Sequence, residues 1–337
     1  MNINIAEDIL KYPHPVLRSR ELKNKVKRVT LCNKHYVVYR DKEGNPVALP
    51  DSCPHRGALL SKGKVNTDGE LVCAYHAWRI NSSGKATCPS VPKKSCKIPL
   101  LKTWDKYGFI WIANPEVSEA DFPEFNFPDY ELIGGFTTLF KAPLKVVLDN
   151  FGEIEHAFQV HSFIGPSVER LDTVDFNVKI EEEKTFGFMS CKYRKMPFFF
   201  GWFFGFKAND LYHNDWEFKF KPLHGCYQNY WTDQTGTKKR PISFIVTSFL
   251  VPVNEKEVNV HVFLQIQIKN KFLRVFAPIL KWCTMLITKF EIKADASIAS
   301  FAPENAEDGT HWKLTYFDKQ IMANRRLMDQ VYFGKVS

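Results

Sequence analysis

The stretch CPHRGALLSKGKVNTDGELVCAYH, residues 53–76, holds two cysteines and two histidines in a regular order. One residue separates Cys53 from His55, two separate Cys73 from His76, and seventeen lie between the pairs. Structural zinc sites usually pair cysteine with cysteine and histidine with histidine, whereas each half here supplies one of each. The mixed pairing suits a [2Fe–2S] cluster with two thiolates on one iron and two imidazoles on the other, and zinc stays the alternative.

With the segment that follows, LVCAYHAWRINSSGK (71–85), this stretch resembles the Rieske motif of ring-hydroxylating and related Rieske non-haem iron oxygenases. The resemblance implies that the two cysteines and two histidines bind a Rieske cluster. Ala77 departs from the family pattern, which usually has glycine after the second histidine. We expect the cluster to tolerate this small change.

A second stretch, LDNFGEIEHAFQVH (148–161), places two histidines five residues apart among three carboxylates. On a regular helix five residues turn through about 500°, so His156 and His161 would point about 140° apart. This excludes the zincin arrangement, in which two histidines four residues apart share one face. From the residues alone, the stretch is either no metal site or a site on a distorted helix.

The family's catalytic domain carries the pattern Asn-x-x-Asp-x-x-His-x4-His, and Asn150, Glu153, His156 and His161 fall on it. The resemblance implies that the two histidines bind a mononuclear Fe(II). Glu153 takes the place of a family aspartate that connects a histidine at this iron to a cluster histidine of a neighbouring subunit. Its expected partners are therefore His76 at one end and His156 or His161 at the other.

The third iron ligand of the family is a carboxylate from a helix far downstream. KFEIKADASIASFAP (289–303) matches that region, with Asp295 as the expected ligand and Glu291, one turn earlier, as the runner-up. Two histidines and one carboxylate would leave positions open for dioxygen beside a substrate.

Along the chain, a β-rich part is followed by an α+β part. Apolar runs and alternation predict strands over 25–115 and 170–268, and helices over 145–163 and from 272 to the end. A proline- and acid-rich run at 114–131 is typical of a linker.

These patterns, with the resemblance, predict an α+β chain of two domains. An all-β Rieske [2Fe–2S] domain is expected over 1–118, with its core at about 28–115. A catalytic domain with mononuclear non-haem iron is expected over 119–337. Its antiparallel sheet would be covered by helices in a helix-grip-like arrangement.

The chain is 45% hydrophobic and 25% charged, as globular proteins are, and its formal net charge is +9. Because the lysines are spread along the sequence, we expect no nucleic-acid partner. A diffuse positive field suits an acidic protein partner or an anionic substrate equally well.

The N-terminal MNINIAEDILKYPHP carries acids and no apolar core, so it predicts no signal peptide and a cytoplasmic location. Disulfides are then not expected. The cysteines outside the motif are interpreted as small buried residues. They are Cys32, Cys88, Cys96, Cys191, Cys226 and Cys283.

Two apolar stretches are candidates for membrane contact. MPFFFGWFFGF (196–206) is too short to span a bilayer, and FLRVFAPILKWCTMLITKF (272–290) contains Arg274 and Lys281. We interpret them as a core strand and an amphipathic helix, with a peripheral membrane contact as the less favoured alternative. The aromatic run could also line an apolar pocket.

The resemblance implies a terminal oxygenase that hydroxylates or oxidatively dealkylates a small organic substrate with O2. Electrons from NAD(P)H would reach the cluster through a reductase or ferredoxin and cross Glu153 to the iron of the adjacent subunit. A homo-oligomer, most simply a trimer, is therefore expected.

Three alternatives stay open: an aromatic-ring cis-dihydroxylating dioxygenase, a Rieske electron-transfer protein, and a zinc-binding protein without oxygen chemistry. The length of the chain favours the shorter, homo-oligomeric, monooxygenase-leaning members of the family. The closing stretch WKLTYFDKQIMANRRLMDQ (312–330) also resembles the last helix of that group.

Overall fold

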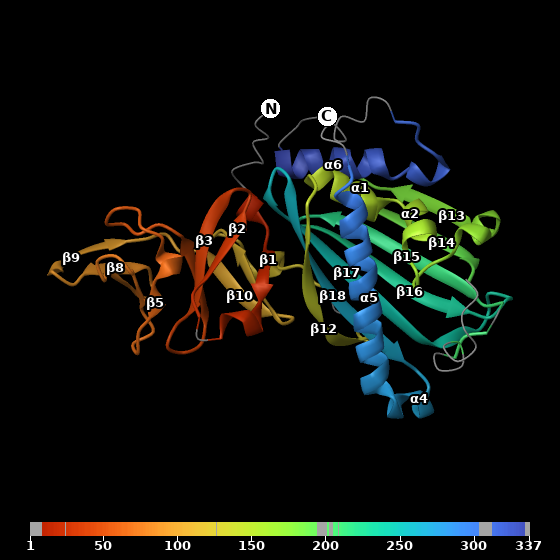
Figure 1. Ribbon diagram of the computed structural model, residues 1–337, viewed down its shortest axis with the longest axis horizontal. Helices are drawn as coiled ribbons and strands as arrows, with labels where there is room; N and C mark the ends of the chain where they lie inside the picture. Colours follow the sequence, from red (N-terminus) through yellow and green to blue (C-terminus); the bar gives the residue numbers. More distant parts are fainter. Residues whose placement is uncertain are drawn as a thin grey trace. The chain divides into compact units, whose positions relative to one another are not determined.

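The computed structural model describes most of the chain (Figure 1). The described residues are 9–23, 25–125, 127–193, 201, 205–207, 209–302 and 312–333. They fall into two compact units. One contains the described residues up to Pro123 together with Val251–Asn254, and the other contains the rest. The division lies just after the predicted boundary at 118, and the return of Val251–Asn254 to the first unit had no signal in the sequence.

The N-terminal unit is built of three small sheets whose neighbouring strands run antiparallel. The first has the order β1 (His14–Arg18), β11 (Phe109–Ala113), β10 (Lys102–Lys106). The second consists of β2 (Lys27–Leu31), β3 (Lys34–Arg40) and β4 (Pro46–Pro50). The third consists of β5 (Lys64–Val65), β6 (Leu71–Val72), β7 (Arg79–Ile80), β8 (Lys85–Cys88) and β9 (Val91–Lys97). Single turns of 3-10 helix lie at Ile9–Lys11, Ser19–Leu22, Leu60–Lys62 and Glu119–Asp121.

The core of this unit lies directly under the motif. Leu60, Leu71 and Ile80 are fully buried and pack with Cys53 and Cys73 in one apolar cluster. Short strands suffice here because each contributes one or two apolar side chains to this cluster. The two motif loops are thereby fixed to a rigid base.

The C-terminal unit is built on one seven-stranded sheet of order β12-β18-β17-β16-β15-β14-β13. The strands are β12 (Glu131–Phe140), β13 (Asp175–Ile180), β14 (Lys184–Lys192), β15 (Leu211–Phe220), β16 (Leu223–Thr232), β17 (Lys239–Asn254) and β18 (Glu257–Ile268). Consecutive strands from β13 to β18 are neighbours, as in a meander, and β12 closes the far edge beside β18. The predicted α+β class with a helix-covered sheet is confirmed.

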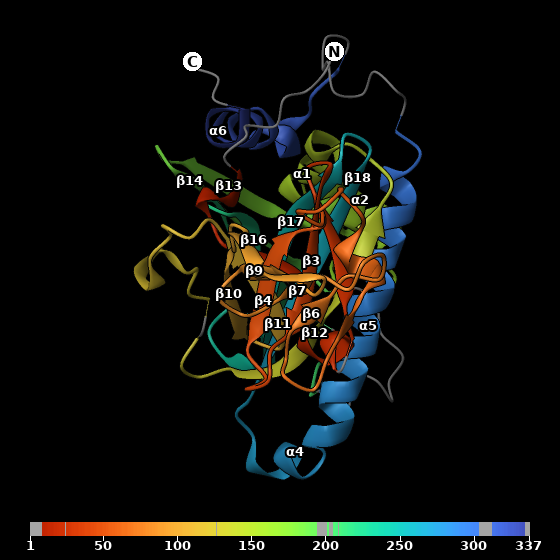
Figure 2. The ribbon, with the colours of Figure 1, turned by 90° about the vertical axis from the view of Figure 1, so that its left-hand side faces the viewer.

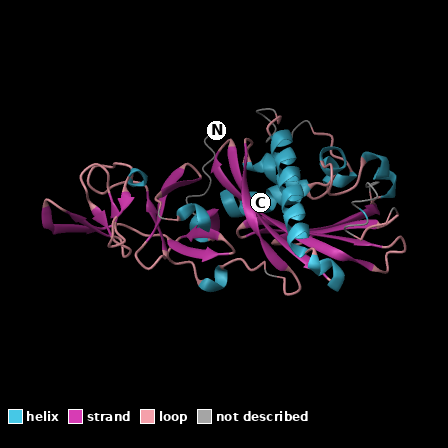
Figure 3. Cartoon of the chain, turned by 60° about the horizontal axis from the view of Figure 1, so that its bottom comes forward, coloured by secondary structure: helices cyan, strands magenta, loops and turns pink. Residues whose placement is uncertain are grey.

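The helices are α1 (Leu144–Gly152), α2 (Glu155–Val160), α4 (Lys271–Val275), α5 (Ala277–Ala299) and α6 (Ile321–Phe333), with 3-10 turns at Val168–Thr173 and Tyr316–Asp318. Figures 1 and 3 show α5 lying across one face of the sheet, where it contacts β12 and β18. Helix α6 packs against β14 and β15, and Figure 2 shows it beside β14. Helix α5 also contacts the short helices α1 and α2, so residues of α5 lie close to residues of these two helices.

The structure describes only one of the two apolar stretches in full. The aromatic run 196–206 lies outside the described residues except for Gly201, Gly205 and Phe206. The stretch 272–290 forms α4 and the first half of α5, but Phe272, Val275 and Trp282 are 64%, 75% and 64% exposed. In the part of the chain that the structure describes, no helix is long and apolar enough to cross a membrane.

The prediction that the remaining cysteines are buried is wrong for most of them. Cys191 is buried and Cys96 is exposed, while the other four are partly exposed. Cys96 lies on β9, an edge strand that has no neighbour on one side to cover it. Edge strands present more of their surface to solvent than central ones do.

Candidate metal centres

Two loops of the same shape present the motif of the N-terminal unit. In the first, the amide of Cys53 donates a hydrogen bond to the carbonyl of Ala58 at 2.8 Å. In the second, the amide of Cys73 donates to the carbonyl of Trp78, also at 2.8 Å. Each loop therefore closes five residues after its cysteine and leaves its histidine at the tip.

The loops also share a left-handed residue. Gly57 has φ +72° and Ala77 has φ +54°, and the amide of each donates to the carbonyl of its own loop's cysteine, at 2.9 and 3.1 Å. Glycine adopts this conformation freely, whereas a side chain with a Cβ pays a steric penalty there. The place where the sequence departs from the family pattern is thus a place where glycine fits better.

The donor atoms divide into a buried pair and an exposed pair. Cys53 and Cys73 are 3% exposed, while the rings of His55 and His76 are exposed, with centroids 4.7 Å apart. Burial raises the pKa of the Cys53 thiol, and the adjacent Cys73 thiol adds to the rise. Buried thiolates need a cation to compensate them, and metal binding supplies it. Two inner thiols and two outer imidazoles fit a Rieske cluster.

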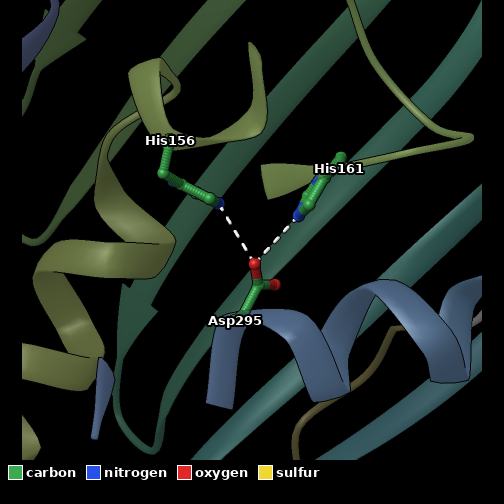
Figure 4. Close-up of side chains that lie close together, drawn as sticks. All are labelled: His156, His161 and Asp295. Atoms are coloured by element: carbon green, nitrogen blue, oxygen red, sulfur yellow. Dashed lines mark hydrogen bonds and ion pairs between the residues drawn. The ribbon is translucent and has the colours of Figure 1, made fainter. Parts of the chain in front are cut away.

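In the C-terminal unit, His156, His161 and Asp295 converge on one point (Figure 4). The Oδ1 atom of Asp295 lies 2.9 Å from Nε2 of His161 and 3.4 Å from Nε2 of His156. Ligand atoms of all three lie within 4.8 Å of one another. Two imidazoles and one carboxylate are the donor set of non-haem Fe(II) oxygenases, so these residues fit a mononuclear iron.

The distorted helix that the spacing of the two histidines requires is present. Helix α1 ends at Gly152, the chain is extended at Glu153, and α2 runs only from Glu155 to Val160. His161 follows as the C-terminal cap of α2, with an extended backbone at φ −81° and ψ 129°. Because His161 has left the helix, its ring turns back to face His156, at a centroid distance of 5.1 Å and an interplanar angle of 85°.

The electrostatics of this point favour a cation. Burial of His156 lowers its pKa, but the carboxylates of Glu153 and Asp295 outweigh burial and raise it to about 10. For Asp295 burial works toward a higher pKa, and hydrogen bonds and charge from His156 and His161 hold it well below its usual range. The carboxylate is therefore ionised, and positive charge placed between the three side chains is stabilised.

Glu153 orients one of the histidines. Its Oε1 lies 2.5 Å from Nδ1 of His156, and its Oε2 accepts from the backbone amides of Glu155 and His156. With Nδ1 engaged in this way, Nε2 of His156 remains for the metal. A carboxylate on the distal nitrogen fixes the tautomer and the orientation of a ligating histidine.

Glu291, the runner-up for the third ligand, has another position. Its Oε1 accepts from the amides of Phe163 and Ile164, at 2.6 and 3.1 Å, and its Oε2 accepts from the amide of Ser162 at 3.2 Å. Glu291 therefore fixes the turn that follows His161, while Asp295 faces the histidines.

The other carboxylates of the stretch 148–161 point away from the triad. Asp149 forms an ion pair with Arg325 of α6, whose Nε lies 2.9 and 3.1 Å from its two oxygens. Glu155 accepts from the hydroxyl of Thr315 at 2.9 Å. Asn150 lines the cavity described next.

A cavity of about 110 Å³ opens beside the triad. One wall comes from β14, β15, β16 and β17, and the other from α5 and the segment 150–166. Its main apolar surface is formed by Phe151, Ile154, Met189, Phe244, Val246 and Ile292. An apolar cavity beside a metal triad, with a few polar groups, is the usual form of a small-molecule site.

Several residues of this site had no signal in the sequence. Arg325 is one of two adjacent arginines in a helix, and only the structure shows that it pairs with Asp149. Asn229, which accepts from the hydroxyl of Tyr212 at 2.6 Å and from the amide of Asn214 at 2.9 Å, lies in a strand with the usual mixture of residues. Polar and apolar residues do not alternate regularly along β15 and β16, so the sequence does not indicate which side chains face the cavity.

Comparison with known proteins identifies the N-terminal domain. The family model of the Rieske [2Fe-2S] domain matches residues 12–105. The vanillate O-demethylase oxygenase subunit of Pseudomonas sp. (strain HR199 / DSM 7063) is 32% identical over 166 residues, which are 45% of this chain and 44% of that one. Aminopyrrolnitrin oxygenase PrnD of Pseudomonas fluorescens is 30% identical over 167 residues, 43% of this chain and 44% of its own. The chain thus spans less than half the length of these relatives.

Among solved structures, dicamba monooxygenase bound to 3,6-dichlorosalicylic acid aligns with a TM-score of 0.79 at 18% identity. The alignment covers 97% of this chain and 98% of that one, so the two share their fold from end to end. The chain therefore contains a Rieske [2Fe-2S] domain, and its overall fold is that of dicamba monooxygenase.

Proposed function

We propose that the chain is the terminal oxygenase of a Rieske non-haem iron system that hydroxylates or oxidatively dealkylates a small organic substrate. The observation that carries the proposal is the triad His156, His161 and Asp295 at the wall of an apolar cavity. A Rieske electron-transfer protein needs neither the triad nor the cavity. When bound at the triad, iron supplies the activation of O2 with electrons from the cluster.

In this proposal Cys53, His55, Cys73 and His76 bind the [2Fe–2S] cluster. Buried thiols and exposed imidazoles suit electron entry and exit on the imidazole side. Neutral histidine ligands also raise the reduction potential of the cluster above that of a four-cysteine cluster. A reductase or ferredoxin fed by NAD(P)H is the proposed donor, and the net charge of +9 favours an acidic one.

The proposed exit route for the electron is Glu153, between His156 and His76 of a neighbouring copy. The 2.5 Å bond from Glu153 to His156 supports the iron end of this route. The route requires a homo-oligomer, and we propose a trimer. The large apolar side chains that α4 and α5 expose support the burial of a surface between copies.

Hydroxylation or dealkylation is favoured over cis-dihydroxylation. One full-length match is to a monooxygenase, and the two relatives named above are an O-demethylase subunit and an oxygenase. A cytoplasmic location is part of the proposal, because none of the eight cysteines, all within the described residues, forms a disulfide, as in a reducing compartment.

The test uses the purified protein with its cluster reduced and iron added. Reoxidation of the cluster by O2 is followed in the visible spectrum, with and without a panel of small aromatic compounds, for the parent and for His156→Ala. We expect binding compounds to accelerate reoxidation in the parent, and His156→Ala to keep the cluster spectrum without that acceleration.

The matched control is His213→Ala, which removes a histidine of the same unit that stacks on Tyr230 outside the triad. It should behave as the parent does. Equal acceleration in His156→Ala would contradict the proposed role of the triad, and a protein that carries a cluster but binds no additional iron would be an electron-transfer protein.

A further inference from the structure

The cavity contains buried hydroxyl groups that the protein itself leaves unused. Ser248 on β17 is fully buried and Thr288 on α5 is 2% exposed, and both line the cavity. Among the described residues, neither Oγ of Ser248 nor Oγ1 of Thr288 has a hydrogen-bond partner. The same is true of Oδ1 of Asn150. Native proteins leave few such groups, and each one calls for a physical reason.

Thr288 has a common alternative that it does not use. Thr284, one turn earlier on the same helix, is also buried and donates to the carbonyl of Leu280 at 2.8 Å. Threonine in a helix often satisfies its hydroxyl in this way. The hydroxyl of Thr288 lacks this bond and lines the cavity, so its hydrogen-bonding capacity remains for a bound molecule.

The charges around the cavity exclude a simple anion site. The lining residues that the structure describes include no lysine and no arginine. Three carboxylates line it, from Glu153, Glu291 and Asp295, and each is already bonded to histidines or to backbone amides. A carboxylate or phosphate on the bound molecule would find no lysine or arginine partner here, and the positive charge at the triad already faces the carboxylates of Glu153 and Asp295, so burial of a further anion is costly. The net charge of +9 therefore does not imply an anionic substrate.

A quaternary ammonium compound also fits poorly. Aromatic side chains such as Tyr212, Tyr227 and Phe244 line the cavity and could face a cation. The quaternary ammonium group itself has no hydrogen-bonding atom, so it would not satisfy the hydroxyls of Ser248 and Thr288. It would also lie beside the positive charge that the triad is built to hold.

We propose that the cavity binds an uncharged, mainly apolar molecule with one hydroxyl, carbonyl or amide group, and that Ser248 and Thr288 recognise that group. The apolar body packs against the phenyl and aliphatic side chains named above. The two hydroxyls lie on opposite elements, a strand and a helix, so together they select the orientation of the molecule relative to the triad. The inference rests on the proposed function only in calling this molecule the substrate.

The experiment compares three probes of the same shape on the holoprotein: toluene, p-cresol and p-toluate. They present no polar group, a neutral hydroxyl and a carboxylate on the same methylated ring. Affinities are measured by ligand-observed NMR titration without an electron donor, so that binding is read without turnover. We expect p-cresol to bind at least 10-fold more tightly than p-toluate.

The variants Ser248→Ala and Thr288→Val each remove one hydroxyl with little change of volume. Each should weaken p-cresol roughly 3- to 10-fold, as expected for one neutral hydrogen bond, and leave toluene unchanged. Thr284→Val is the matched control on α5 and should leave all three affinities unchanged. Because Ser248→Ala and Thr288→Val alter different elements, the folding failure of one leaves the other as the test.

Two outcomes overturn the inference. Binding of p-toluate as tight as that of p-cresol would show that the cavity accepts an anion. Unchanged p-cresol affinity in both variants would show that the hydroxyls hold water only. If the expected selectivity is found but O2 chemistry is absent, the proposed function fails and the binding preference stands.

Discussion

The two candidate metal centres are built in opposite ways. The proposed cluster ligands lie between Cys53 and His76 on two loops that close on themselves, and their histidines reach the surface. Two of the proposed iron ligands, His161 and Asp295, are 134 residues apart in the sequence, on elements that meet only when the sheet and α5 have packed. The first centre depends on local loop geometry, and the second depends on the tertiary structure of its whole unit.

Because the two centres are built independently, a substitution in one should remove its metal and leave the metal of the other bound. This is the largest effect that we expect. Asp295→Ala should retain the visible spectrum of the cluster and weaken binding of the additional iron by roughly 100-fold or more. Loss of a residue that only supports a ligand already costs about 10- to 100-fold. Cys73→Ser should do the reverse. Iron and sulfide analysis with visible absorption tests both, and loss of both metals in Asp295→Ala would show that the centres are not independent.

Glu153→Gln tests whether the two centres are connected. The variant keeps the shape of the side chain and removes its charge, so both metals should stay bound while turnover falls by roughly 10- to 100-fold. Glu155→Gln, two residues away and facing Thr315, is the control and should turn over as the parent does. Full turnover of Glu153→Gln with its native donor would contradict the bridging role.

Each unit also contains one buried histidine whose pKa is lowered to about 4 by burial, His14 in the first and His224 in the second. An unfolded histidine titrates near 6.5. Between these values the unfolded chain binds more protons, so the stability these groups provide is present above about pH 6.5 and is lost as the pH falls toward 4. The loss is roughly 3 kcal/mol for each histidine.

Urea unfolding between pH 7.5 and pH 4, followed separately for each unit, measures this effect. His14→Gln should flatten the acid limb of the first unit alone, and His224→Gln that of the second. If the parent were equally stable across this range, neither imidazole would be buried as a neutral group.

Glu291→Gln tests the tertiary dependence of the iron centre with a smaller change. Its carboxylate holds three backbone amides after His161, so the variant should lose about 1–3 kcal/mol of stability in its unit. Iron affinity should fall, because the position of His161 depends on this turn, and the cluster should be unaffected. Calorimetry and iron titration give the two numbers. Stability unchanged by the variant would mean that solvent replaces these bonds.

The smallest expected effect concerns the loops of the cluster. Ala77→Gly relieves a left-handed alanine, and Gly57→Ala creates one in the matching loop. We expect changes of about 0.5–1 kcal/mol with opposite signs, a gain for the first and a loss for the second. Thermal loss of the cluster absorbance measures both. Changes of the same sign would show that the loops are not equivalent.

What could be predicted from the sequence follows the same division. The proposed cluster ligands could be identified from the sequence because each Cys–His pair lies within one short loop, so the spacing of the residues determines their arrangement. The spacing of His156 and His161 excluded one kind of site and left two interpretations, no metal site or a distorted helix. In the structure α2 ends at Val160, so His161 lies outside the helix that carries His156. Asp295 and Glu291 lie one turn apart and are both buried, so the sequence offers no way to choose between them. In the structure Asp295 contacts both histidines, whereas Glu291 accepts from the turn after His161.

The lining of the cavity had no readable pattern. Strand β17 is buried on both faces from Ile242 to Val251, so it shows no alternation that would point Ser248 toward the cavity. Thr288 and Thr284 both belong to the buried side of α5, and the sequence does not separate the satisfied hydroxyl from the unsatisfied one. Such distinctions arise from packing between elements that are distant in the chain.

The most direct test of two centres in one chain is the ratio of iron to acid-labile sulfide in the purified, iron-reconstituted protein. The account predicts about three irons for every two sulfides, two irons in the cluster and one at His156, His161 and Asp295. A ratio of one to one would leave the triad without iron and contradict the oxygenase proposal. A colourless protein containing zinc and no sulfide would contradict both centres.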